Sequence, residues 1–197
     1  MTGWRQTIQQ RSRMAAEQAV GPLTRQGVSP NQLTVAGLLL NAGAGAIMAR
    51  GWLPLGGVAV LGASAFDLFD GALARVAGQK TRFGAFFDST LDRYSESLLF
   101  FGLLVWFART GRWPGAILCY LSLLGSLMVS YARARAEGLG LDCEVGWFQR
   151  PERMVVLGGG LLLPSPGPMV SLTILAALSQ VTVIQRMIHV YRLTAGR

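Results

Sequence analysis

Long uncharged, apolar runs separated by short basic or Gly- and Pro-containing segments dominate the chain. The runs cover 26–49, 51–66, 113–132 and 154–185. About 20 consecutive apolar residues are enough for a helix to cross a bilayer. The runs lack the polar face at helical spacing that the core helices of a soluble protein would present. The pattern therefore predicts an all-α membrane protein, with a soluble helical bundle as the less favoured alternative.

Prolines, glycines and charged residues set the expected helix boundaries. Ser29-Pro30-Asn31 is typical of a helix start, because proline disfavours helical geometry in the preceding residue and is tolerated in a first turn. Three prolines within 164–168 must end a helix. Six transmembrane helices are expected, at 30–49, 54–76, 84–108, 113–137, 151–163 and 169–191. The fifth would be only about 20 Å long, shorter than a hydrocarbon core of about 30 Å.

The first residues are more polar than the rest of the chain. Residues 2–19 mix aromatic and aliphatic side chains with arginines and glutamines, which predicts an amphipathic juxtamembrane helix lying in the headgroup layer. A basic tail is the alternative. The absence of an apolar stretch before Ala19 argues against a cleavable signal peptide. The expected organisation is a juxtamembrane helix and linker over 1–28, followed by a six-helix transmembrane catalytic domain over 29–197.

Composition and charge support a lipid environment. The chain is 51% hydrophobic and 14% charged, whereas soluble domains carry about 25% charged residues. The net charge is +8, but the basic residues are not gathered in a patch with interleaved aromatics, so no nucleic-acid partner is expected. With six helices and a cytoplasmic N-terminus, the non-cytoplasmic side keeps only Arg50, Arg109 and Arg112. This positive-inside asymmetry predicts a multi-pass inner-membrane protein whose basic segments face the cytoplasm.

Four acidic residues lie in or beside the second and third predicted helices. They are Asp67, Asp70, Asp88 and Asp92. A carboxylate near the bilayer centre costs at least about 2.5–3.5 kcal/mol, so such residues normally bind something. The spacings of three and four place each pair on one face of its helix, and the short connection makes the helices antiparallel neighbours. Clustered carboxylates without His or Cys favour hard cations, and an open, hydrated site favours Mg²⁺ or Mn²⁺.

These acids allow two other interpretations. The acids could form structural salt bridges with Arg75, Arg82 and Arg93. That interpretation leaves the neighbouring small residues Gly71, Ala74 and Gly84 unexplained, since small residues let a ligand or helix approach the backbone. A cation channel or transporter would place acids through the membrane depth, whereas these cluster toward the predicted cytoplasmic end. Arg75 beside them could hold a phosphate through its bidentate guanidinium.

The complete pattern resembles a known signature. Asp67-x2-Asp70-Gly71-x2-Ala74-Arg75-x8-Gly84-x3-Asp88-x3-Asp92 is similar to the motif of the CDP-alcohol phosphotransferase family. The resemblance implies two divalent metal ions, Mg²⁺ or Mn²⁺, with Asp67, Asp70 and Asp88 as ligands and Asp92 near the second metal as general base. It implies a CDP site formed by Asn31, Thr34, Gly71, Ala74, Arg75, Thr81 and Gly84. Asn31 and Thr34 could equally be ordinary helix-start residues.

The same resemblance implies the reaction and the assembly. The enzyme would transfer a phosphatidyl group from CDP-diacylglycerol to an alcohol and release CMP, with a carboxylate deprotonating the incoming hydroxyl. The likeness to this family also implies that the protein is a homodimer. Small residues at Gly43, Gly45 and Gly125 would permit close helix packing.

Arginines beside the predicted metal site suggest the acceptor. Segments 130–137 and 150–153 resemble the corresponding stretches of bacterial phosphatidylinositol phosphate synthases, although Arg133 and Gln149 stand where those proteins usually have Lys and Glu. By this likeness an inositol phosphate would be held by Ser130, Arg133, Arg150 and Arg153. Arginine forks suit phosphate, so a phosphorylated alcohol is favoured over a neutral one. Phosphatidylglycerophosphate synthesis from glycerol 3-phosphate is the runner-up, and arginines that bind only lipid headgroups are a further alternative.

Overall fold

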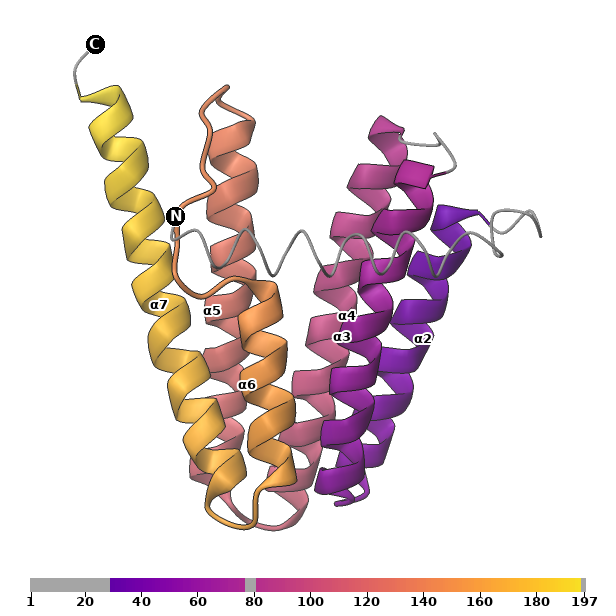
Figure 1. The fold of residues 1–197 in the computed structure, drawn as a ribbon. Coiled ribbons are helices and arrows are strands. Elements are labelled where there is room, and N and C mark those ends of the chain that lie inside the picture. The colour runs from indigo at the N-terminus through magenta and orange to yellow at the C-terminus, as the bar shows by residue number, and fades with distance from the viewer. Residues whose placement is uncertain (1–28, 77–80, 196–197) are drawn as a thin grey trace.

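The computed structural model describes the backbone of residues 29–76 and 81–195, and the side chains of 29–67 and 81–195. These residues form six helices and no strand (Figure 1). The helices are α2 (Pro30–Ala49), α3 (Leu53–Val76), α4 (Arg82–Arg109), α5 (Trp113–Glu137), α6 (Arg150–Leu162) and α7 (Gly167–Thr194). The helix predicted over 2–19 lies outside the described residues. The all-α fold and its six main helices are confirmed.

Two helices begin earlier than expected because of the chemistry of their first turns. α4 begins at Arg82, two residues earlier than predicted, because the Thr81 hydroxyl accepts a hydrogen bond from the Gly84 backbone N–H at 2.9 Å. α7 begins at Gly167, two residues early, because Pro168 fits the first turn of a helix. The predicted shortness of the fifth helix is confirmed, since α6 has 13 residues.

A reciprocal cap fixes the start of α2. The Ser29 hydroxyl accepts from the Gln32 N–H at 3.3 Å, and the Gln32 side-chain oxygen accepts from the Ser29 N–H at 2.9 Å. This capping box satisfies two backbone donors that a helix start leaves unpaired. It fixes Asn31 in the first turn of α2.

The helices form two packed groups that join along one edge. α2 packs against α3 and α4, while α7 packs against α5 and α6; contacts of α3 with α6 and of α4 with α5 connect the groups. Figure 1 shows the two groups diverging toward the end that carries the start of α4 and the end of α5. The apolar core includes Leu99, Phe100 and Leu103 of α4 and Leu157 of α6. The residues of the predicted site lie toward the diverging end.

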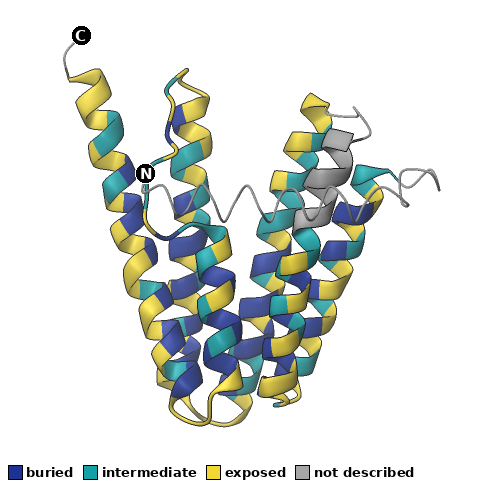
Figure 2. Cartoon of the chain, viewed as in Figure 1, coloured by how far each residue is buried: buried dark blue, intermediate teal, exposed yellow. Residues whose placement is uncertain are grey.

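The outer faces of the helices are apolar. Leu39, Val58, Phe101, Ile117 and Ile184, from five different helices, are each more than half exposed. Figure 2 shows the exposed residues on the outside of the bundle and the buried ones where helices face one another. Within the described part of the chain, α2, α5 and α7 are long and apolar enough to cross a membrane. Exposed apolar side chains on five helices, together with three helices of membrane-spanning length, indicate a membrane protein.

The glycines of α2 differ in what they contact. A Cβ added at Gly45 would lie 2.5 Å from the Leu98 carbonyl oxygen of α4, and one added at Gly102 of α4 would collide with the Gly45 backbone. Gly43, two residues earlier, has open space where a side chain would stand. Close packing within the chain is therefore present at Gly45, whereas Gly43 has no close neighbour within this chain.

We expect Gly45→Ala to destabilise the protein and Gly43→Ala to leave it unchanged or slightly stabilised. Overpacking a tight helix contact costs about 1–3 kcal/mol, because the backbones must separate. At Gly43 alanine only gains helix propensity. Thermal unfolding of the two variants in the same detergent measures the difference. Equal midpoints would contradict the close approach of α2 and α4.

Candidate functional site

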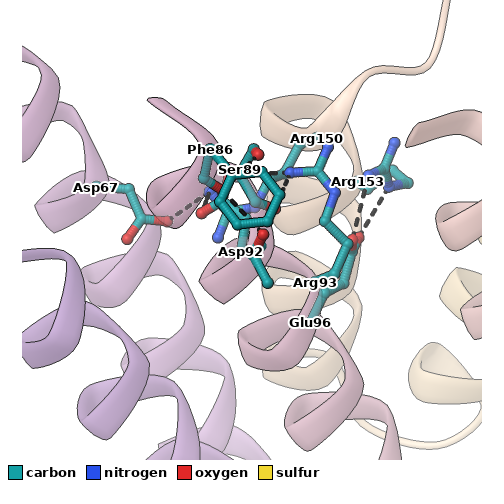
Figure 3. Close-up of polar contacts among 9 residues, drawn as sticks. Asp67, Phe86, Ser89, Asp92, Arg93, Glu96, Arg150 and Arg153 are labelled. Carbon is teal, nitrogen blue, oxygen red and sulfur yellow. Dashed lines mark hydrogen bonds and ion pairs between the residues drawn. The ribbon is translucent and has the colours of Figure 1, made fainter. Parts of the chain in front are cut away.

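One guanidinium group joins two of the predicted metal ligands. Arg150 Nη1 lies 2.9 Å from Asp67 Oδ2 and 2.8 Å from Asp92 Oδ1 (Figure 3). The three side chains are 20–22% exposed, so the group is mostly withdrawn from solvent but reachable. Asp67 belongs to α3, Asp92 to α4, and Arg150 is the first residue of α6. The site therefore lies where three helices meet.

The surroundings of the acids are consistent with a compact polyanionic site. Asp88 stands one turn before Asp92 on α4 and interacts electrostatically with both Asp67 and Asp92. On the α2 side, a Cβ at Gly37 would lie 3.1 Å from Asp67 Oδ1, so the glycine leaves room for this carboxylate. Arg93 is a weaker partner, at 3.7 Å from Asp92. Among the described side chains, Arg93 is thus the member of the expected salt-bridge set that pairs with a site acid, and Arg150 makes the shorter contacts. The side chain of Arg75, another member of that set, lies outside the description.

The donor set fits a hard divalent cation. Two carboxylates from different helices converge on one positive group, and all donors are oxygens, as Mg²⁺ and Mn²⁺ prefer. Among the residues whose side chains are described, no cluster of three or more acids, His or Cys is tight enough to hold a metal. The predicted ligand Asp70 lies in α3, but its side chain is outside the described set. The four-ligand arrangement thus stays a prediction.

Some predicted nucleotide-binding residues lie together at the start of α4. A Cβ at Gly84 would lie 3.0 Å from Thr81 Oγ1 and 3.6 Å from Asn31 Oδ1. Asn31 of α2 therefore faces the Thr81 cap. Thr34 donates to the Pro30 carbonyl oxygen at 3.2 Å within its own helix. The other three, Gly71, Ala74 and Arg75, occupy the last two turns of α3, and their side chains lie outside the description.

The predicted acceptor residues fall into two environments. Arg133 is partly exposed near the end of α5 and pairs with Glu137 at 2.7 Å and Glu144 at 3.5 Å. Ser130 is half-buried one turn earlier on the same helix. Arg153 is buried, and its guanidinium binds both carboxylate oxygens of Glu96 at 2.9 and 3.2 Å. Of the four predicted acceptor residues, Arg150 is the one that binds the described metal-site acids, Asp67 and Asp92.

Two charged residues of this region were missed in the sequence. Arg186 of α7 is 3% exposed, donates to the Val145 and Val129 carbonyls, and interacts electrostatically with Arg133 and Arg153. Arg186 directly follows the apolar run 154–185, and this position in the sequence could have marked it as a charge that needs a partner. Glu96 follows Asp92 by four residues and so continues the acidic face of α4. Both residues are buried charges in an apolar helix and need partners.

One face of α7 holds the segment before α6. The Phe148 and Trp147 N–H groups donate to Thr182 Oγ1 and Gln185 Oε1, each at 3.2 Å. Arg186 Nε donates to the Val145 carbonyl at 2.9 Å, and His189 Nε2 lies 3.1 Å from the Asp142 carbonyl oxygen. The α7 residues recur at helical spacing, from 182 to 189. They fix the backbone that leads into Arg150.

Known proteins match this chain over most of its length. A family model described as CDP-alcohol phosphatidyltransferase matches residues 27–193. An archaetidylinositol phosphate synthase of Methanothermobacter thermautotrophicus is 41% identical over 173 residues, 85% of this chain and 86% of that protein. A phosphatidylinositol phosphate synthase of Mycobacterium tuberculosis is 38% identical over 174 residues, covering 84% and 80% of the two chains.

Solved structures share the fold as well as the sequence. The M. tuberculosis phosphatidylinositol phosphate synthase with CDP-DAG bound superposes with a TM-score of 0.83 at 34% identity, over 89% of this chain and 93% of that one. The same enzyme in complex with manganese and citrate gives a TM-score of 0.80 at 33% identity, over 89% and 88%. The family match, the relatives and the shared fold agree: this chain is a transferase and belongs to the CDP-alcohol phosphatidyltransferase family.

Proposed function

We propose that the protein transfers a phosphatidyl group from CDP-diacylglycerol to an inositol phosphate, releasing CMP and forming phosphatidylinositol phosphate. The observation that carries this proposal is the Arg150 bridge between Asp67 and Asp92. It brings an anion-binding guanidinium to the carboxylates that would face the reacting phosphate. Relatives named for inositol phosphate transfer support the same acceptor.

Asp92 is the proposed general base. In the reaction, its carboxylate takes the proton from the acceptor hydroxyl while the hydroxyl oxygen forms a bond to the lipid-side phosphorus of the donor. The bond from that phosphorus to the bridging oxygen breaks, and CMP leaves. Asp92 is 21% exposed, so it can reach a bound hydroxyl while remaining largely shielded from water.

Two divalent cations, Mg²⁺ or Mn²⁺, would be held by Asp67, Asp70, Asp88 and Asp92. When bound, they would neutralise the diphosphate of the donor and the leaving CMP. The manganese in the related M. tuberculosis structure supports this assignment. The cytidine and its phosphates would lie against Asn31, Thr34, Gly71, Ala74, Arg75, Thr81 and Gly84.

Ser130, Arg133, Arg150 and Arg153 are proposed to form the acceptor site. Arg150 Nε is buried and has no hydrogen-bond partner among the described atoms, so the guanidinium has donor capacity beyond its two acid contacts. The buried Arg186, which borders Arg133 and Arg153, adds positive charge to the same region. Such a concentration of guanidinium groups favours a phosphorylated alcohol over a neutral one.

The proposal is tested by an acceptor panel. Purified protein and radiolabelled CDP-diacylglycerol are mixed with inositol 1-phosphate, glycerol 3-phosphate, serine or inositol, with Mg²⁺, with Mn²⁺ or with EDTA. We expect lipid product with inositol phosphate alone, and none with EDTA. Product only with glycerol 3-phosphate would mean that this compound is the acceptor and that the enzyme is a phosphatidylglycerophosphate synthase. A CDP-linked ether lipid, offered in parallel, tests the lipid backbone.

The placement in the membrane is part of the proposal. We propose six membrane-spanning helices in the inner membrane, with the active site toward the cytoplasm, and a homodimer. The exposed apolar faces and the sequence bias of Lys and Arg support this orientation. Labelling of single cysteines at Leu139 and Trp113 by a membrane-impermeant reagent, in intact cells and inverted vesicles, tests it. Native mass spectrometry of the detergent-solubilised protein tests the dimer.

A further inference from the structure

We propose that Glu96 is a positioning residue for the acceptor site: by binding Arg153 it orients the first turn of α6, and thereby sets where Arg150 meets the acids. This inference rests on the proposed function. It assigns a role to a residue outside the metal, nucleotide and acceptor sets. Glu96 is itself an anion and cannot bind an acceptor phosphate, so any effect on the acceptor must act through its partner.

The Glu96–Arg153 pair is deeply buried and geometrically constrained. Both side chains are 2% exposed. The guanidinium uses Nε and Nη2 on the two carboxylate oxygens, at 2.9 and 3.2 Å, and Nη1 on the Phe148 carbonyl at 3.3 Å. This fork-to-fork arrangement fixes the orientation of both groups and not only their separation.

The pair repeats, one turn further along, the contact made at the acids. Asp92 and Glu96 are four residues apart on α4, and Arg150 and Arg153 are three apart on α6, so each couple shares a helix face. Asp92 binds Arg150 at 2.8 Å and Glu96 binds Arg153 at 2.9 Å. Figure 3 draws both ion pairs, with Asp92 and Glu96 from α4 and Arg150 and Arg153 from α6. The deeper pair therefore sets the register of the outer one.

Helix packing alone does not fix the placement of α6 relative to α4. Among the described helices, α6 packs extensively against α3 and α7, whereas α4 and α6 are not a closely packed pair. α4 carries Asp92 and α6 carries Arg150, so their relative placement decides the site geometry. A buried ion pair adds little net stability compared with apolar residues of similar volume. The two-point contact between Arg153 and Glu96 instead constrains how α6 is oriented relative to α4. We infer that orientation is the main role of this pair.

Kinetics of Glu96→Gln test the role in the reaction. We expect the KM for inositol phosphate to rise about tenfold or more, while the KM for CDP-diacylglycerol changes less than about twofold. Glu96→Asp, which keeps the charge, should recover part of the loss. Ser122→Ala is the matched control, because it removes a buried polar contact between α5 and α7, the 3.1 Å bond to the Leu172 carbonyl. An unchanged acceptor KM in a folded Glu96→Gln enzyme would overturn the inference.

A distance measurement tests the geometry without any turnover. Spin labels at Tyr94→Cys of α4 and Val155→Cys of α6, both exposed positions, are placed in a background in which Cys119 and Cys143 are replaced by alanine. The paired variant Glu96→Met with Arg153→Met removes both charges together and so avoids leaving one buried and unpaired. Double electron–electron resonance, measured on labelled protein diluted with unlabelled chains, then gives the distance between the labels on α4 and α6.

We expect a single narrow distance in the parent and in Ser122→Ala, and a shifted or broadened one in the paired Met variant. An unchanged distribution in that variant overturns the positioning role, whatever the enzyme does. Absence of product with every acceptor in the parent protein would instead refute the proposed function, and the distance result would still decide whether Glu96 orients α6. The two failures are therefore distinguishable.

Discussion

Asp92→Asn is expected to abolish measurable transfer to inositol phosphate while leaving the fold intact. The amide has the shape of the carboxylate but cannot accept the hydroxyl proton. Loss of a general base alone lowers kcat by about 10²–10⁴-fold. The expected loss is at the upper end of this range or beyond it, because Asp92 is also a proposed metal ligand. The rate of CMP release in the presence of saturating Mn²⁺ measures the effect.

A matched control separates this effect from general damage. Asp142 is an exposed acid in the segment between α5 and α6, outside the proposed site. We expect Asp142→Asn to retain the parent kcat and the parent unfolding midpoint. A folded Asp92→Asn enzyme that kept more than about a tenth of the parent kcat would rule out Asp92 as the base. Asp88, the next acid on the same face of α4, would then be the alternative candidate.

The sequence was sufficient for the helices because their ends carry strong local signals. α5 has the predicted limits, from Trp113 after a Gly-containing turn to Glu137 before Gly138. α4 and α7 each begin two residues before the predicted start, and α7 ends three residues after the predicted end. Both early starts come from local chemistry that the sequence carries. Thr81 three residues before Gly84 is a capping signal, and proline is favoured in a first turn.

The acids were predictable because charge inside an apolar helix is rare. Asp67 and Asp92 belong to different helices, and the expected antiparallel contact brings them onto a common cation. Their distances to the nucleotide-binding residues could not be predicted, since those depend on how α2 packs against α4. The close approach at Gly45 sets that packing, and nothing in the sequence separates Gly45 from the open Gly43.

The docking of α6 was the least predictable feature. Sequence likeness assigned Arg150 and Arg153 the same role, whereas the structure places one on the acids and buries the other against Glu96. Glu96 was overlooked because it lies outside the acid motif, although it continues the same helix face. Arg186, directly after the last apolar run, received no site role from the sequence. Each of these contacts joins residues more than 30 positions apart in the chain, where helical periodicity carries no information.

Arg150→Gln is expected to change acceptor and metal binding in opposite directions. Arg150 is proposed to hold the acceptor phosphate, yet in the described structure it neutralises Asp67 and Asp92. Truncating one partner of a shielded charge pair costs about 2–5 kcal/mol, so kcat/KM for inositol phosphate should fall by about 30-fold to several thousandfold. The same change removes a positive charge beside the metal ligands, so Mn²⁺ should bind about tenfold more tightly.

Steady-state kinetics and titration of free Mn²⁺ by electron paramagnetic resonance, without substrates, measure the two effects separately. Arg109→Gln, an exposed arginine at the opposite end of α4, is the control and should alter neither. A fall in kcat/KM with unchanged Mn²⁺ affinity would mean that Arg150 leaves the carboxylates in solution and serves the acceptor alone. Weaker binding of both ligands would mean that its main effect is to hold α6 in place. Only opposite changes fit a guanidinium that the metal displaces from the acids and that is then free to bind the acceptor phosphate.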